Sequence, residues 1–152
     1  MKIKGVIMKS FFDEIAAIID QLPDAIAFRE SERGEDSRSF GNSYAVYESS
    51  LIKVRFVKDR DEIRTEIAAP QMVKWLSLDQ ICEVLGRPVT GLDLQSNGEA
   101  LVRNYSEILK AITDTAIART SEAIDVQARK KRDGMLARLG KCKNDPHGPT
   151  IA

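Results

Sequence analysis

The sequence predicts an α+β fold, in which an antiparallel β-meander of three to four strands is packed by an N-terminal helix and followed by a short helix and a long C-terminal helical segment. Runs 42–48, 51–58 and 62–68 alternate apolar and polar residues between short polar separators, as adjacent antiparallel strands with one solvated face do. An amphipathic segment precedes these runs, and apolar residues at helical spacing follow them. With 152 residues, the chain is long enough to bury the core of one domain.

The N-terminal helix is expected to begin after Ser10, whose side chain can cap it, and to end at Pro23. Asp13 and Glu14 then lie at the end where the helix dipole favours negative charge. The apolar residues of this helix recur every three to four positions and are Phe11, Phe12, Ile15, Ile18, Ile19 and Leu22. We expect this face to pack on the sheet.

A first strand is predicted over residues 24–31, followed by a charged loop from Glu32 to Arg38. In the meander that follows, alternation separates a buried face from a solvated face. The predicted buried face consists of Ile52, Val54, Phe56, Ile63 and Ile67.

Two helical segments are predicted after the sheet. Ser77 to Gln80 has the spacing of a capping box, and Gly86 and Pro88 act as stop signals for this short helix. Ser96 and Glu99 repeat the capping-box pattern before a long segment, which either continues as one helix past Ile117 or breaks near residues 113–115. We expect a single domain over residues 1–140 and a flexible tail over residues 141–152.

Cysteine usage and hydropathy predict a cytoplasmic protein. Cys82 and Cys142 lie far apart in the sequence, which favours free thiols in a reducing compartment. No segment reaches the ~20 apolar residues of a membrane span, and charged residues interrupt the start of the chain where a signal peptide would need an apolar stretch. Either Met1 or Met8 can be the natural start.

The sequence predicts no catalytic, metal or cofactor site, and hence no enzyme. The single histidine, His147, falls in the predicted tail, which excludes cysteine–histidine, serine–histidine and multi-histidine sites. No glycine-rich phosphate loop is present. Asp59, Asp61 and Glu62 cluster at a predicted turn, and a carboxylate-based enzyme at this place is an alternative that requires a concave site there.

The solvated face of the meander is the candidate partner-binding surface of a non-enzymatic protein-binding module. Arginine and tyrosine are enriched at protein–protein hot spots. The candidate residues are Tyr47, Lys53, Arg55, Lys58, Arg60, Arg64 and Glu66. Tyr44 and Tyr47 are expected on opposite faces, which argues against the exposed aromatic pair with which RNA-binding sheets stack bases.

The charge of the chain is zero overall but unevenly distributed. Residues 127–152 contain seven Lys/Arg and two Asp, which gives +5, so residues 1–126 carry −5. The basic run Arg129, Lys130, Lys131 and Arg132 is the candidate site for an alternative function, that of a nucleic-acid-associated accessory protein. The sparsely apolar helix beyond Ile117 would be better covered by a second copy, which predicts a homodimer through the C-terminal helix.

The run from Phe40 to Leu85 resembles small bacterial immunity-type proteins of polymorphic-toxin systems. The matching residues are Asn42-Ser43, Val54-Arg55-Phe56, Asp59-Arg60 and Trp75. The resemblance covers about a third of the chain and consists of hydrophobic alternation and turn residues. It implies a cytoplasmic protein that neutralises a cognate toxin domain by binding to it. Immunity proteins that block nucleases are often acidic, whereas this chain is neutral with a basic end.

Overall fold

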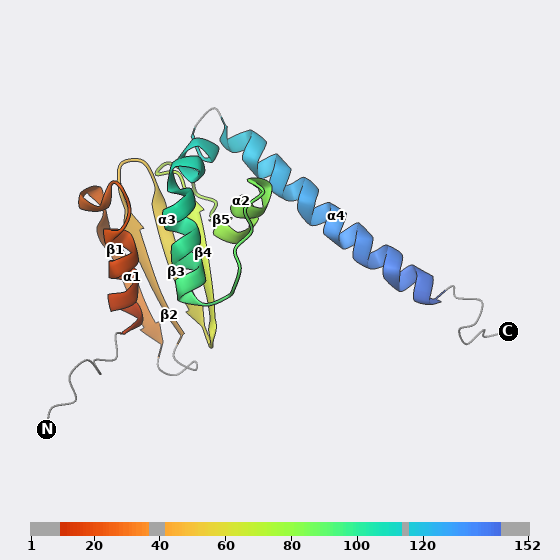
Figure 1. Ribbon diagram of the computed structural model, residues 1–152, viewed down its shortest axis with the longest axis horizontal. Coiled ribbons are helices and arrows are strands. Elements are labelled where there is room, and N and C mark those ends of the chain that lie inside the picture. Colours follow the sequence, from red (N-terminus) through yellow and green to blue (C-terminus); the bar gives the residue numbers. More distant parts are fainter. Residues whose placement is uncertain (1–9, 37–41, 114–115, 144–152) are drawn as a thin grey trace, which may run out of the picture.

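The computed structural model describes residues 10–36, 42–113 and 116–143, and it has the α+β fold that the sequence predicts. Five antiparallel strands form one sheet in the order of the chain. They are β1 (Arg29–Asp36), β2 (Asn42–Glu48), β3 (Lys53–Asp59), β4 (Glu62–Ala68) and β5 (Leu76–Ser77). Helices α1 (Phe11–Asp20) and α3 (Leu94–Ala111) lie across one face of the sheet, and α2 (Leu78–Val84) lies near β5. We call the sheet with these three helices the body, and α4 (Ile117–Lys143) extends away from it (Figure 1).

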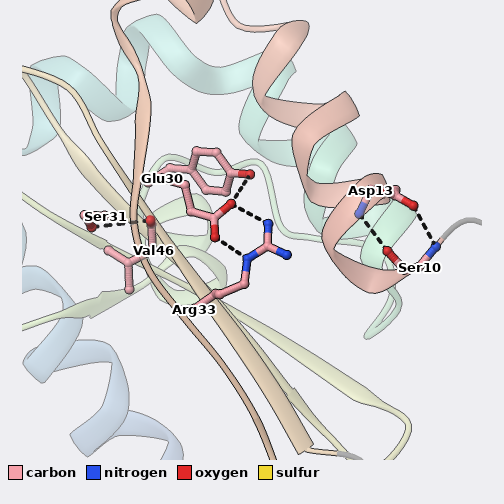
Figure 2. A network of polar contacts seen from close by, with 7 residues as sticks. Ser10, Asp13, Glu30, Ser31, Arg33 and Val46 are labelled. Atoms are coloured by element: carbon pink, nitrogen blue, oxygen red, sulfur yellow. Dashed lines mark hydrogen bonds and ion pairs between the residues drawn. The ribbon is translucent and has the colours of Figure 1, made fainter.

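Helix α1 forms where its cap and its apolar spacing predict. The side chain of Ser10 accepts the N–H of Asp13, and the Asp13 carboxylate accepts the N–H of Ser10, so the capping box is complete (Figure 2). Ile15, Ile18 and Ile19 are buried against the sheet and α3. The predicted sheet core is also confirmed, because Ile52, Val54, Phe56, Ile63 and Ile67 are all buried.

The predicted first strand forms, but its predicted bounds were wrong, because only residues 29–31 of the expected 24–31 belong to it. Residues 25–27 form a short 3₁₀ helix (η1, Ala25–Ala27), and β1 runs from Arg29 to Asp36 through most of the segment that we expected to be a charged loop. Strand β1 is the edge of the sheet, so its charged side chains reach solvent while its backbone pairs with β2. The register shifts between Glu30 and Glu32, which is an irregularity typical of edge strands. Residues 37 and 38 of the predicted loop lie outside the described residues.

Both capping boxes predicted after the sheet are wrong, although both helices form. Within the described chain, the Ser77 side chain makes no capping hydrogen bond at the start of α2. Asp93, rather than Ser96, caps α3, because its carboxylate accepts the N–H of Ser96 at 3.4 Å. Cys82 of α2 is a buried free thiol, whereas the side chain of Cys142 is not among the parts described.

The long C-terminal segment is two helices. Helix α3 ends at Ala111 and α4 begins at Ile117, so of the two alternatives the break is correct. The break is stabilised by Thr120, whose hydroxyl donates to the carbonyl of Ala111 at 2.7 Å. Helix α4 continues to Lys143, beyond the boundary predicted for the tail, and residues 144–152, with His147, lie outside the described residues. None of the described helices combines the length and apolar character that crossing a membrane requires.

Candidate functional site

The sheet face opposite to the core is the candidate site. Strand alternation directs Val54 and Phe56 into the core and therefore directs their neighbours in β3 to the other side. Cross-strand pairing then places Tyr44, Val57 and Arg64 in one row, and Val46, Arg55 and Glu66 in the next. We call this surface the open sheet face, and it consists of Tyr44, Val46, Lys53, Arg55, Val57, Arg64, Glu66 and Trp75.

Trp75 and Arg55 are in contact with each other on the open sheet face. The guanidinium carbon of Arg55 lies 4.4 Å from the centroid of the Trp75 ring. The same guanidinium donates a hydrogen bond from Nε to one carboxylate oxygen of Glu66 at 3.0 Å, and its Nη2 forms an ion pair with that oxygen at 2.9 Å. Because Arg55 is held from two directions, its orientation is fixed before any partner arrives.

Lys53 completes this cluster from the same strand. Its ammonium nitrogen lies 5.2 Å from the Trp75 ring centroid and donates to the carbonyl of Met72 at 3.0 Å. Two cations therefore share one aromatic ring, while one carboxylate, Glu66, balances one of the two charges. This half-exposed cluster presents an aromatic surface with a local excess of positive charge.

A second feature of the open sheet face is a shallow depression beside Tyr44. It has a volume of about 370 Å³, and its lining includes Gly34, Tyr44, Val57 and Arg64. The Tyr44 ring lies directly on Gly34, where any side chain at position 34 would clash with it. The Tyr44 hydroxyl donates to Glu32 at 2.8 Å, and this hydrogen bond raises the pKa of Tyr44. The depression thus combines Tyr44 and Val57 with charged residues of both signs, which are Glu35, Lys58, Asp59 and Arg64.

The structure brings together four of the seven candidate residues from the sequence. Lys53, Arg55, Arg64 and Glu66 share the open sheet face. The sequence did not identify Trp75, because it stands before β5, a strand of two residues that was not predicted. The available signal was the position of Trp75 next to Leu76, whose side chain enters the core and so directs Trp75 outward.

Of the other three candidates, Tyr47 does not lie on this face, and the prediction that placed it there was wrong. Lys58 and Arg60 lie near the end of β3 and in the turn that follows it. Tyr47 is paired with Val54 and is buried on the helix-covered side, where burial raises its pKa. Lys58 follows Phe56 in the strand alternation, and it also lines the depression beside Tyr44. Arg60 lies in the β3–β4 turn with φ of 60°, and its N–H donates to the side chain of Asn42 at 3.1 Å.

Tyr47 instead belongs to a network that attaches α1 to the edge strand. Glu30 accepts hydrogen bonds from Arg33 and from the Tyr47 hydroxyl, the latter at 3.2 Å. The hydrogen bonds from Arg33 lower the pKa of Glu30. The guanidinium of Arg33 also lies 4.3 Å from the Phe12 ring centroid. Figure 2 shows Glu30 and Arg33 on the side of β1 that faces α1, with Ser31 on the opposite side. This network serves the fold.

Asp59 and Glu62, which are cross-strand partners beside the β3–β4 turn, line different hollows. Asp59, Asp61 and Glu62 are all exposed. Asp59 lines the depression beside Tyr44, whereas Glu62 lines a separate hollow of about 490 Å³ with Thr65 and Asn97. Among the described residues, no three His, Cys, Asp or Glu side chains are grouped so that they would hold a metal ion.

The basic run lies on the exposed part of α4. Consecutive helical residues point about 100° apart, so Arg129, Lys130, Lys131 and Arg132 face different directions and cannot all contact one flat partner. Lys131 forms an ion pair with Glu83 of α2 at 2.7 Å. The run therefore offers a nucleic acid fewer cations than its sequence indicates.

Comparison of the chain with protein-family models, with curated proteins and with solved structures gives no match. The functional assignment therefore rests on the chemistry of these surfaces.

Proposed function

We propose that this protein is a non-enzymatic protein-binding module and that the open sheet face is its contact surface. One observation carries the proposal, namely the Trp75 ring held against Arg55 and Lys53 on the side of the sheet that faces away from the core. Tryptophan, tyrosine and arginine contribute most to hot spots in protein interfaces. All three residue types occur here within a few strands of one another.

The order of the cluster favours binding. A long arginine side chain normally loses rotamer freedom when a partner immobilises it, which costs roughly 0.5–1.5 kcal/mol. Arg55 is already fixed between Trp75 and Glu66, so most of its rotamer freedom is lost when the chain folds and little more is lost on binding. The neighbouring depression, with Tyr44 and Val57, would accept an apolar side chain of the partner, and Arg64 beside it would meet a carboxylate.

We further propose that the partner is a toxin domain and that the protein acts as an immunity protein in the cytoplasm. The resemblance between residues 40–86 and immunity-type proteins supports this proposal. Of the residues that carry the resemblance, Arg55 and Trp75 contact each other on the open sheet face. Two of the motif residues thus belong to the surface that we assign to the partner.

If the proposal holds, we expect a toxin domain to be encoded directly upstream of this gene, and that domain is the probe. Co-expression with the wild-type protein should protect cells, and the two purified proteins should form a complex. Trp75→Ala should weaken the complex at least 30-fold, as expected for a hot spot worth about 2 kcal/mol. Lys74→Ala is the matched control, because Lys74 is the exposed neighbour of Trp75 outside the cluster.

The thermal melt of each variant must first show that it is folded. If Trp75→Ala folds, protects cells and binds as the wild type does, the open sheet face is not the contact surface. Retention of the wild-type protein on DNA or RNA at low salt, lost steeply as salt increases, would support the nucleic-acid alternative instead.

A further inference from the structure

Helix α4 is much longer than its contact with the body. Its 27 residues span about 40 Å at 1.5 Å per residue, and Figure 1 shows it extending away from the sheet. Thr120 and Ile124 are buried near its start. Met135, Leu136 and Leu139, near its other end, are each more than half exposed.

The exposed apolar residues continue the buried stripe. Ile117, Ala128 and Leu139 recur every 11 residues, and Ile124 and Met135 have the same separation. An 11-residue period keeps all of them on one side of a nearly straight helix. The first part of this stripe packs on the body, and its continuation faces solvent. Helices in water are stabilised mainly by packing of their apolar face, so we expect the exposed part of the stripe to pack against another surface.

The charges beside the stripe indicate what kind of surface would pack on it. Residues 128–140 contain five basic side chains and one acidic side chain, Asp133. Arg132 and Arg138 flank the stripe on its two sides, as helical periodicity requires. Two α4 helices packed together would bring these cations into contact with one another, so a pair of C-terminal helices is disfavoured. The surface that packs on the stripe should therefore be apolar and bordered by acidic residues.

The body of the same protein has such a surface between α1 and α3. A groove of about 470 Å³ is lined there by Ala17, Ile18 and Leu94, together with Gln95 and the acidic residues Glu14 and Asp93. The hydrogen bond from Ser96 lowers the pKa of Asp93, which keeps this carboxylate charged. The charge of the chain is divided in the same sense, with −5 on residues 1–126 and +5 on residues 127–152.

We propose that the Met135 and Leu139 side chains of one copy dock into the α1–α3 groove of a second copy, with Arg138 facing Glu14. The same contact made reciprocally closes a twofold dimer. This dimer specifies the homodimer that the sequence predicts through the C-terminal helix, since the helix of each copy packs on the other copy's α1 and α3. It does not involve the open sheet face.

Sedimentation velocity of the full chain tests the dimer. Between about 1 and 100 μM at low salt, the wild type should shift from monomer to dimer, and roughly 0.5 M salt should weaken the association because the ionic part is screened. Leu139→Asp should remain monomeric. Ala137→Asp is the matched control and should dimerise, because Ala137 lies on the side of α4 opposite to the stripe.

Reversal of the groove charge separates this arrangement from paired helices. Glu14→Arg alone should reduce dimer formation at least tenfold, and combining it with Arg138→Glu should restore the dimer. Gln80→Arg, on the exposed side of α2, should have no effect. A wild type that is monomeric at all concentrations overturns the proposal. So does a dimer that Glu14→Arg leaves intact, since helix pairing would then account for it.

Discussion

Among single residues, Tyr105 has the clearest consequence for stability. It is only 2% exposed, and its hydroxyl donates to Asp24 at 3.5 Å. Burial, with the charge of Asp24, raises the pKa of Tyr105 from its ordinary value of 10.0 to about 12. The folded state therefore keeps a proton that the unfolded chain releases above pH 10. Stability from this difference is complete below pH 10 and is lost as the pH rises toward 12.

We therefore expect the urea midpoint of unfolding to fall between pH 10 and pH 11.5, and to fall less steeply for Tyr105→Phe than for the wild type. Tyr44→Phe is the control, since Tyr44 lies on the open sheet face rather than in the core. Its slope should stay closer to that of the wild type. Equal slopes for the wild type and Tyr105→Phe would contradict the role of Tyr105.

Individual side chains also show where sequence reasoning reaches its limit. Alternation correctly buries Ile63 and Ile67, and it directs Thr65 inward between them. It cannot identify Asn97 as the group that accepts the Thr65 hydroxyl at 2.9 Å, because the two residues are 32 positions apart. Tyr47 was placed on the wrong face because the sequence did not reveal that it pairs with Val54. Cross-strand partners share a face of the sheet, and Val54 is buried.

Among the elements, those with strong periodicity were predicted and those defined by position in the sheet were not. Strands β2, β3 and β4 have one wet and one dry face, so their sequence records their environment. Strand β1 is exposed at an edge, and its charged sequence resembles a loop. The end of α3 depends on Thr120 of the next helix, a contact that only the folded chain makes.

Two glycines in helices should respond to alanine in opposite directions. Alanine is favoured over glycine within a helix by about 1 kcal/mol. A Cβ at Gly134 meets nothing within 4 Å, so Gly134→Ala should increase the helicity of α4. A Cβ at Gly98 would lie 2.7 Å from Cδ1 of Ile18, where α1 and α3 are in contact, so Gly98→Ala should lower the free energy of unfolding by about 1–2 kcal/mol.

Urea unfolding measures the effect of Gly98→Ala, and amide hydrogen exchange in α4 measures that of Gly134→Ala. The two variants control for each other, because they make the same chemical change in helices that differ in packing. An increase in unfolding free energy for Gly98→Ala would mean that Ile18 moves aside at little cost and that the close approach of α1 and α3 is not tight.

At the scale of the whole molecule, the body and the outer part of α4 are physically separate structures. The core joins α1, the sheet, α2 and α3, and α4 contributes Ile124 to it. The open sheet face belongs to the body, whereas the basic stripe belongs to the extension. The sequence indicated this division through its charge, −5 against +5, but it did not place the C-terminal half of α4 outside the body.

A chain that ends at Gln127 should therefore keep the fold. It retains Ile117, Thr120 and Ile124, and it loses the ion pair between Lys131 and Glu83, in which the lysine side chain is 65% exposed. Exposed ion pairs contribute roughly 0–1 kcal/mol, and the upper value corresponds to a loss of about 2–4 °C in melting temperature for a domain of this size.

The comparison is made by circular dichroism against a chain that ends at Lys143, at a concentration where both are monomeric. The shorter chain should show less helical signal, because residues 128–143 of α4 are missing, and a cooperative melt at nearly the same temperature. It should also stay monomeric at high concentration, since it lacks the side chains that we dock into the groove. A melting temperature lower by more than about 10 °C would mean that the outer part of α4 stabilises the body of its own chain, because dilution excludes contacts with a second copy.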